Sequence, residues 1–111
     1  MEHNVIQDGN ITIVELAGNI DIASAASFDE TISGLIDNGQ TTMLLDFSRV
    51  EFIASMGLRM LLKTGQRIES EDGKLHICCI NDTVASVFGM VGLDTIIPVF
   101  ETKELALEGL A

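Results

Sequence analysis

Residues 44–58 read LLDFSRVEFIASMGL, and this stretch decides the fold. It begins within an apolar run over residues 41–47 that shows no clean alternation and is typical of a strand buried on both faces. We expect a loop over residues 48–51, followed by an amphipathic helix from about Met56 to the Asp72-Gly73 pair. The apolar stripe of this helix consists of residues at spacings of three and four, namely Leu58, Leu61, Leu62, Gly65 and Ile68.

Outward from this stretch, apolar periodicity and turn residues alternate along the whole chain. The Ala17-Gly18-Asn19 segment is expected to end the second strand, and Asn38-Gly39 to stop the first helix. Since strands and helices alternate, neighbouring strands are predicted to be parallel, in one α/β domain over residues 1–111. The remaining expected elements are strands over 5–7, 11–16, 74–80 and 96–100, and helices from Ser24, from Asn81 or Asp82 to Gly92, and over 103–110.

The composition excludes several classes of partner. The 111 residues carry a net charge of −11. This negative charge would repel the phosphates of nucleic acids and of anionic membranes, so a general binding surface for either is excluded. Tyrosine and tryptophan, which form base- and sugar-stacking platforms, are absent. There is neither an apolar run of about 20 residues nor a signal peptide at the start. We therefore expect a cytoplasmic protein that neither binds nucleic acid nor inserts into a membrane.

The two cysteines, Cys78 and Cys79, are adjacent within an expected strand. Neighbouring strand residues point to opposite faces, so one thiol is expected in the core and the other toward a helix or solvent. The spacing lacks the CxxC pattern of redox or zinc sites, and His76 is the only nearby histidine. We interpret both cysteines as small apolar fillers and expect no metal and no cofactor.

Motifs of enzymes are absent from the sequence. There is no GxxxxGK[ST], no GxGxxG after a strand and no GxSxG. Two histidines, His3 and His76, lie outside any recognisable catalytic pattern. We therefore expect a protein that is not an enzyme.

Two features gather at the helix that follows residue 54. Ser55 directly precedes this helix, where its hydroxyl can accept from unpaired backbone N–H groups as an ordinary N-cap. Three basic residues, Arg59, Lys63 and Arg67, recur every fourth position and so lie along one flank, beside Met56 and Met60. This flank is either a solvated face or a surface that docks a partner.

In four segments the sequence resembles the STAS family, whose simplest members are bacterial anti-sigma factor antagonists. The segments appear in the family's order and spacing, and the resemblance covers nearly the whole chain. The resemblance implies a mixed sheet of about five strands with about four helices mainly on one side. The matching segments are Leu16–Asp21 (L-x-G-x-[IL]-D), Leu44–Ile53 (strand and loop), Gly57-Leu58 with Leu61-Leu62, and Val91–Asp94 (x-G-L-D).

The resemblance also implies a function. The family's phosphorylated serine lies in a D-S-[ST]-G-L motif, which corresponds here to residues 54–58, with Ser55 as the phosphoacceptor. Ala54 and Met56 depart from the motif's acid and second hydroxyl, and Asp21 matches a family acid near the same loop. The residues we predict to contact the partner are Asp21, Ala54, Met56, Gly57, Arg59, Met60 and Lys63.

The function so implied is that of an anti-sigma factor antagonist. When unphosphorylated it would bind an anti-sigma factor that is itself a serine-kinase-like protein, and phosphorylation of Ser55 would release it. A PP2C-type phosphatase would reset the switch. The alternatives are a STAS scaffold that is never phosphorylated, suggested by Ala54 and Met56, and an accessory subunit of a partner-switching or transport complex.

Overall fold

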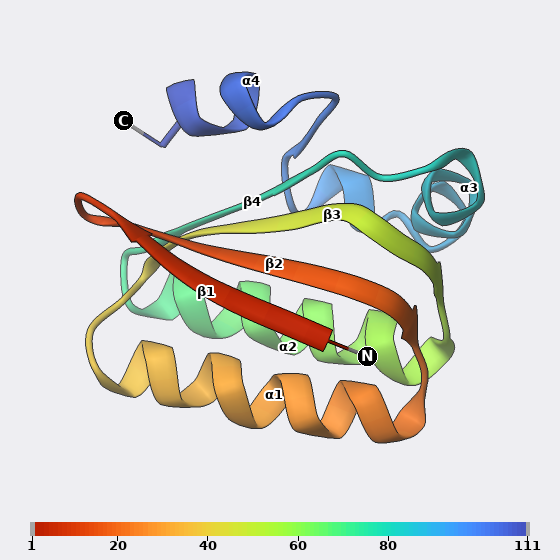
Figure 1. Cartoon of the computed structure of the whole chain (residues 1–111), viewed down its shortest axis with the longest axis horizontal. Helices are drawn as coiled ribbons and strands as arrows, with labels where there is room; N and C mark the ends of the chain where they lie inside the picture. The colour runs from red at the N-terminus through yellow and green to blue at the C-terminus, as the bar shows by residue number, and fades with distance from the viewer. Residues whose placement is uncertain (1, 111) are drawn as a thin grey trace.

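The computed structural model describes residues 2–110 and shows a five-stranded mixed sheet with the strand order β1-β2-β3-β4-β5 (Figure 1). Strand β1 is antiparallel to β2, and every other neighbouring pair is parallel. The expected α/β fold is therefore confirmed. In chain order the elements are β1 (Glu2–Asp8), β2 (Ile11–Ile20), α1 (Ile22–Asp37), β3 (Thr42–Ile53), α2 (Ser55–Ser70), β4 (Lys74–Cys78), α3 (Asp82–Val91), a 3₁₀ turn (Leu93–Thr95), β5 (Val99–Phe100) and α4 (Lys103–Glu108).

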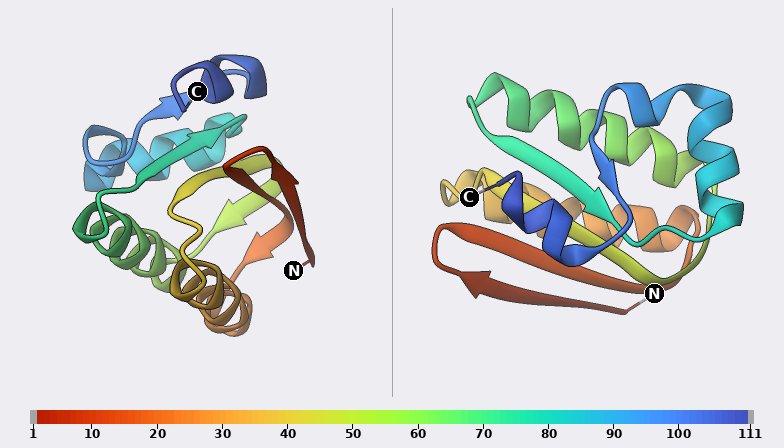
Figure 2. Two further views of the ribbon diagram at one scale, coloured as in Figure 1. Left: turned by 90° about the vertical axis from the view of Figure 1, so that its left-hand side faces the viewer. Right: turned by 90° about the horizontal axis from the view of Figure 1, so that it is seen from above.

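The helices divide unequally between the two faces of the sheet. Helices α1, α2 and α3 contribute buried residues to the larger core, whereas the C-terminal α4 packs on the opposite face (Figures 1 and 2). On β3 the division follows the two-residue period of a strand: Leu45 and Phe47 face the larger core, and Leu44 faces α4. The prediction that helices lie mainly on one side is thus confirmed, with α4 as the exception.

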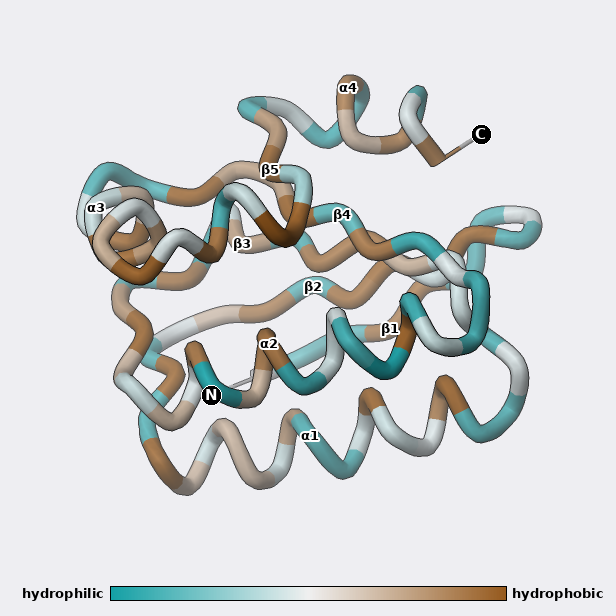
Figure 3. Tube along the Cα trace, turned by 180° about the vertical axis from the view of Figure 1, so that it is seen from behind, coloured by the Kyte–Doolittle hydropathy of each residue, from teal (hydrophilic) through white to brown (hydrophobic). Residues whose placement is uncertain are grey.

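The larger core is filled by aliphatic side chains and three buried phenylalanines. Phe28, Phe47 and Phe88 are all fully buried, and the rings of Phe47 and Phe88 meet edge to face with centroids 6.0 Å apart. Seen from behind, α1 and α2 run side by side below the strands, and β3, above them in the picture, is largely hydrophobic (Figure 3). Because β3 is covered on both faces, its sequence lacks the alternation of a half-exposed strand.

Two expected strand ends are wrong, for one reason. Strand β2 continues through Ala17-Gly18-Asn19 to Ile20, and β3 continues through the expected loop at 48–51 to Ile53. The two continuations pair with each other in parallel, with register shifts at Glu15/Ala17 and Gly18/Asn19. Gly18 has a positive φ of 91°, which glycine adopts without steric cost. Both strands therefore continue past the turn-forming residues at which we expected them to end, because the two segments pair with each other through an irregular register.

Later elements also differ from expectation at their ends. Strand β4 stops at Cys78 because Cys79 adopts a left-handed conformation with φ of 66°. Strand β5 covers only Val99–Phe100, because the N–H groups of Ile96 and Ile97 donate back to the Leu93 carbonyl and Pro98 has no N–H to donate. By contrast, the expected capping of α3 is confirmed: Asn81 accepts from the Val84 N–H at 2.8 Å, and Gly92 closes the helix with φ of 72°.

Within residues 2–110, no helix is both long enough and apolar enough to cross a membrane.

Candidate functional site

Helices α1 and α2 begin side by side at one edge of the sheet. Strands β2 and β3 are parallel, and each is followed directly by the N-cap of a helix, Asp21 for α1 and Ala54 for α2. The Ala54 N–H donates to the Ile20 carbonyl at 2.8 Å, which joins the two strand-to-helix connections. The carboxyl ends of parallel strands are the usual place for binding sites in open α/β sheets. Residues 21 and 54–56 therefore share one edge.

Ser55 is the first residue of α2 and not its N-cap, which corrects the sequence interpretation. The N-cap is Ala54, whose extended backbone has φ of −86° and ψ of 170° and whose side chain makes no capping bond. The first N–H groups of the helix consequently lack an intrahelical acceptor and a side-chain cap. Ser55 itself is exposed. Its hydroxyl thus stands at the positive end of a 16-residue helix.

Gly57 holds the start of α2 close to the sheet. A Cβ on this buried residue would lie 2.7 Å from Ile53 Cγ1 and 2.8 Å from Ile20 Cγ2. Both isoleucines are themselves buried at the ends of β3 and β2. Only glycine allows this approach, which positions Ser55 and Met56 at the surface. Gly57 is thus buried beneath the predicted partner surface and does not form part of it.

Asp21 is occupied by the capping of α1. Its Oδ1 accepts from the Ser24 backbone N–H at 2.9 Å and from the Ser24 hydroxyl at 2.8 Å. The bond from the Ser24 N–H, followed by the bond from its hydroxyl, lowers the pKa of the Asp21 carboxyl below its usual value of 3.8. The exposed carboxylate therefore adds negative charge at the shared edge while it stabilises the helix that bears it.

An apolar groove of about 330 Å³ lies between the first two turns of α1 and α2. Met56 is exposed in it, whereas Met60 is buried at its floor. Ile22, the first residue of α1, is 69% exposed, which is unusual for so large an apolar side chain. The lining residues are Ile22, Ala25, Ala26 and Asp29 from α1, and Met56, Arg59, Met60 and Lys63 from α2.

The three basic residues of α2 have different environments. Lys63 pairs with Asp29 of α1 at 3.1 Å, and Arg67 pairs with Asp37 of α1. No such carboxylate partner is found for Arg59 among the described residues. Two of the three charges therefore link the paired helices, and Arg59 is an exposed charge that lines the groove without such a link.

The structure thus brings most of the predicted site residues to one edge, and it adds four that the sequence interpretation missed. Ser55, Ala54, Met56, Arg59, Met60 and Lys63 all lie at the start of α2, with Asp21 on the adjoining connection. The α1 side of the groove was missed because its residues matter only once the two helices are paired. One signal was available: Ile22 precedes the apolar stripe of α1 by a single turn. The missed residues are Ile22, Ala25, Ala26 and Asp29.

A comparison with known families gives a match to the STAS domain over residues 2–106. The chain belongs to the STAS domain family. Within this family, the anti-sigma-F factor antagonist RsfB of Mycobacterium tuberculosis is 27% identical over 96% of this chain and 86% of its own length.

Solved structures share the fold at lower identity. An anti-sigma factor antagonist from Mycobacterium paratuberculosis is 24% identical, covers 98% of this chain and 92% of its own, and superposes with a TM-score of 0.90. The anti-sigma factor antagonist SpoIIAA in its unphosphorylated form is 23% identical, covers 98% and 96%, and gives 0.85. The phosphorylated form of this Bacillus protein, 22% identical over 99% and 100%, gives 0.78. These structures therefore show that the chain shares its fold with solved anti-sigma factor antagonists.

Proposed function

We propose that this STAS domain binds an anti-sigma factor when unphosphorylated and is released when Ser55 is phosphorylated. The observation that carries the proposal is the position of Ser55. It is exposed, it is the first residue of α2, and it stands beside an apolar groove that ends in exposed Ile22 and Met56. A phosphate on this residue would change the charge of the surface without burying anything in the domain itself.

The domain would tolerate the modification because of the helix start. Phosphate adds about −1.5 to −2 charges at neutral pH, and the N–H groups and dipole of α2 favour negative charge there. Arg59 lies four residues farther along, on the same face of the helix, within reach of a phosphate on Ser55. A partner docked over Ser55 would instead have to bury the charge, which costs several kcal/mol unless it is paired.

The proposed binding surface combines the groove with the charge beside it. Met56 and Ile22 supply exposed apolar area, and Arg59 supplies a positive charge without an acidic partner in the described residues. We expect the partner to be an anti-sigma factor, as the names of the relatives suggest, and the resemblance to the STAS family implies that it is serine-kinase-like. In this proposal residues 1–111 form one non-enzymatic domain, a PP2C-type phosphatase removes the phosphate, and the protein acts in the cytoplasm, where sigma factors meet RNA polymerase.

The relatives support the switch itself. SpoIIAA has been solved in an unphosphorylated and a phosphorylated form. A second candidate, a scaffold that is never phosphorylated, is favoured by one observation: Ala54, where the family motif has an acid, gives α2 no side-chain cap and no charge beside the acceptor.

The test is incubation of the purified protein with its candidate kinase and ATP. We expect a mass gain of about 80 Da, the mass of one phosphoryl group, that maps to Ser55 and is lost in Ser55→Ala. The absence of any phosphate would support the scaffold, and a phosphate on another residue would overturn the role proposed for Ser55.

Binding of the anti-sigma factor is measured in parallel with Ser55→Asp. We expect at least about a 100-fold loss of affinity, since each 1.4 kcal/mol is tenfold. An acid at the first helical position stabilises a helix by about 0.3–1 kcal/mol, so the loss would not reflect unfolding. Ser86→Asp is the matched control, because Ser86 is also exposed and helical but lies on α3, outside the groove. Equal binding by Ser55→Asp and wild type would overturn the switch.

A further inference from the structure

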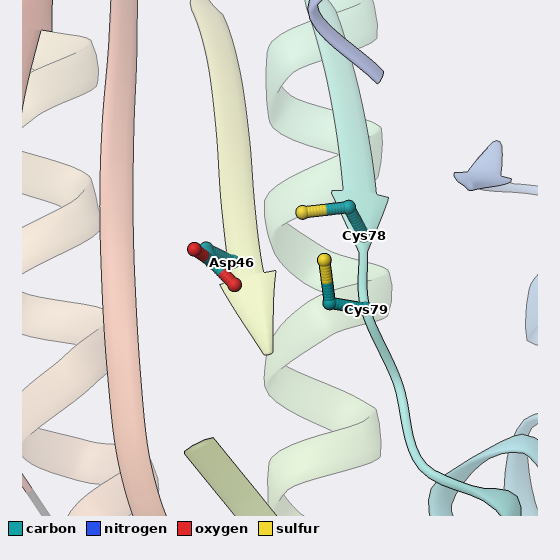
Figure 4. Close-up of side chains that lie close together, drawn as sticks. All are labelled: Asp46, Cys78 and Cys79. Carbon is teal, nitrogen blue, oxygen red and sulfur yellow. The ribbon is translucent and has the colours of Figure 1, made fainter. Parts of the chain in front are cut away.

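A second group of reactive side chains lies on the opposite face of the sheet, under α4. Asp46 of β3 is paired in register with Cys78, the last residue of β4. The Asp46 carboxylate and the sulfurs of Cys78 and Cys79 all lie within 4.8 Å of one another. Figure 4 shows both sulfurs on the side of β4 that faces Asp46.

The backbone at Cys79 creates this cluster. In a continuing strand, adjacent side chains would point to opposite faces, as the sequence interpretation assumed. Cys79 instead has φ of 66°, one of two positive values among the non-glycine residues described. This left-handed conformation is costly for a residue with a Cβ. It ends the strand and turns the second thiol back beside the first.

We propose that Cys78, Cys79 and Asp46 bind a thiophilic divalent metal ion of the zinc class. Two thiolates and a carboxylate are three of the ligand types that zinc takes, at about 2.3 Å and 2.0–2.2 Å, in tetrahedral geometry. Such bond lengths place the ligand atoms roughly 3.6–3.8 Å apart. The cluster would therefore have to close by about an ångström at most, which side-chain rotation can supply. The fourth ligand would be solvent, reached past the half-buried Cys79.

The neighbouring groups orient the carboxylate and set the charge of the site. The Ser48 N–H donates to Asp46 Oδ1 at 2.9 Å, which leaves Oδ2 for another partner. That partner is now Lys103 of α4, whose Nζ is 3.7 Å from Oδ2 and 3.4 Å from the Glu15 carboxylate. With both thiols deprotonated, the three ligands carry three negative charges. The nearby Lys103 ammonium reduces the attraction of these charges for a divalent cation but does not abolish it.

This inference is independent of the proposed phosphorylation switch, since the cluster lies under α4 and Ser55 lies at the start of α2. The thiols are free in the structure, Cys78 being buried. Burial raises the pKa of the Cys78 thiol, and contact with the Cys79 thiol and the Asp46 carboxylate raises it further. A metal ion must therefore displace the proton of the Cys78 thiol when it binds.

The experiment is a titration of the reduced full-length protein with Zn²⁺ against a chromophoric chelator, and with Cd²⁺ followed by thiolate-to-metal absorption in the ultraviolet. The chain has no tryptophan and no tyrosine, so this absorption is observed against a low background. We expect one ion per chain. Cys79→Ser should lose at least about tenfold in affinity and most of the absorption, because it removes a direct ligand.

Two further variants sharpen the test. Lys103→Leu should bind the metal several-fold more tightly, because it removes the ammonium that faces Asp46 Oδ2. Asp94→Asn, which removes an exposed acid outside the cluster, should bind as wild type. Unfolding of each variant without metal, followed by far-UV circular dichroism, identifies any that is misfolded; Cys79 is chosen for substitution because it is less buried than Cys78.

The proposal is overturned if Cd²⁺ binds without the thiolate absorption, or if a folded Cys79→Ser variant retains wild-type affinity. It is also overturned if binding depends on His3 or His76 and not on the cysteines. Tighter binding by Lys103→Leu would support a site at Asp46, and unchanged or weaker binding would place the ion elsewhere.

Discussion

Replacement of Gly57 by alanine should destabilise the domain although alanine is the better helix former. The new Cβ would lie 2.7 Å from Ile53 Cγ1 and 2.8 Å from Ile20 Cγ2, closer than real Cβ contacts. Both isoleucines are almost fully buried, so they have no open space into which to move. Overpacking of this kind costs about 1–3 kcal/mol. The gain in helix propensity returns up to about 1 kcal/mol. With the full propensity gain subtracted, a net loss of up to about 2 kcal/mol is expected.

Two other helical glycines provide the matched control. Gly34 in α1 and Gly89 in α3 have nothing within 4 Å of the position where a Cβ would stand. Alanine there should stabilise the domain by about 0.5–1 kcal/mol, because it restricts the unfolded chain and favours the helix. The difference between Gly57→Ala and the two controls isolates the overpacking at the start of α2.

The assay is urea unfolding followed by far-UV circular dichroism, because the chain has no tryptophan. A change in the midpoint at constant slope reports stability alone. Each kcal/mol should also move the melting temperature by roughly 4–8 °C for a domain near this size. If Gly57→Ala were as stable as Gly34→Ala, the close approach of α2 to the ends of β2 and β3 would be refuted. The role we give that approach in placing Ser55 would be refuted with it.

Three further predictions concern the caps and the charge pairs. Asn81→Ala should cost about 1–2 kcal/mol in urea unfolding, since it removes the cap on the Val84 N–H and the two bonds that Asn81 Nδ2 donates to the Val50 and Glu51 carbonyls; Asn81→Asp keeps the acceptor but not the two donors, so it should also be less stable than wild type. Removal of the Lys63–Asp29 pair should cost only about 0.2–1 kcal/mol, less at high salt, because Lys63 is 66% exposed; a large loss would show that the pair holds the helices together. The fold lowers the pKa of Asp21 below 3.8. The stability that ionised Asp21 gives the fold is therefore present above pH 3.8, and it is lost as the pH falls through the lower pKa of the folded state. The unfolding midpoint of Asp21→Asn should therefore fall less steeply than that of wild type between about pH 5 and pH 2; equal slopes would contradict the capping role.

The helices were predictable because their evidence is local. The stripe of α2 and the cap and stop of α3, Asn81 and Gly92, are each encoded within a few residues. The strand ends were not, because residues 17–20 and 49–53 become strand only by pairing with each other through two register shifts. A turn-forming sequence such as Ala17-Gly18-Asn19 gives no local sign that it pairs as a strand with a segment far along the chain.

The same difference between local and long-range evidence decides which parts of the candidate site were predictable. Ser55 and the basic flank were visible in the sequence, whereas the groove was not, since half of it comes from α1. The position of Ser55 was wrong by one residue. Capping preference favours serine over alanine, but the bond from Ala54 N–H to the Ile20 carbonyl fixes the chain before the helix. The tertiary bond decides which residue is the cap, and it leaves the serine hydroxyl exposed.

Strand β3 connects the two proposed sites and also separates them. Asp46 points from it toward α4, whereas the strand ends at Ile53, beside the starts of α1 and α2. Ions at the cysteine cluster and partners at Ser55 would thus act on opposite faces of one rigid sheet, with no shared side chain. Coupling between two sites requires an element with two arrangements that both ligands bias, and the buried middle of β3 offers none. A metal ion should therefore stabilise the packing of α4 without changing the affinity for the anti-sigma factor at the Ser55 edge. A variant that loses metal binding can thus still be tested for partner binding, and a variant that loses partner binding can still be tested for metal binding.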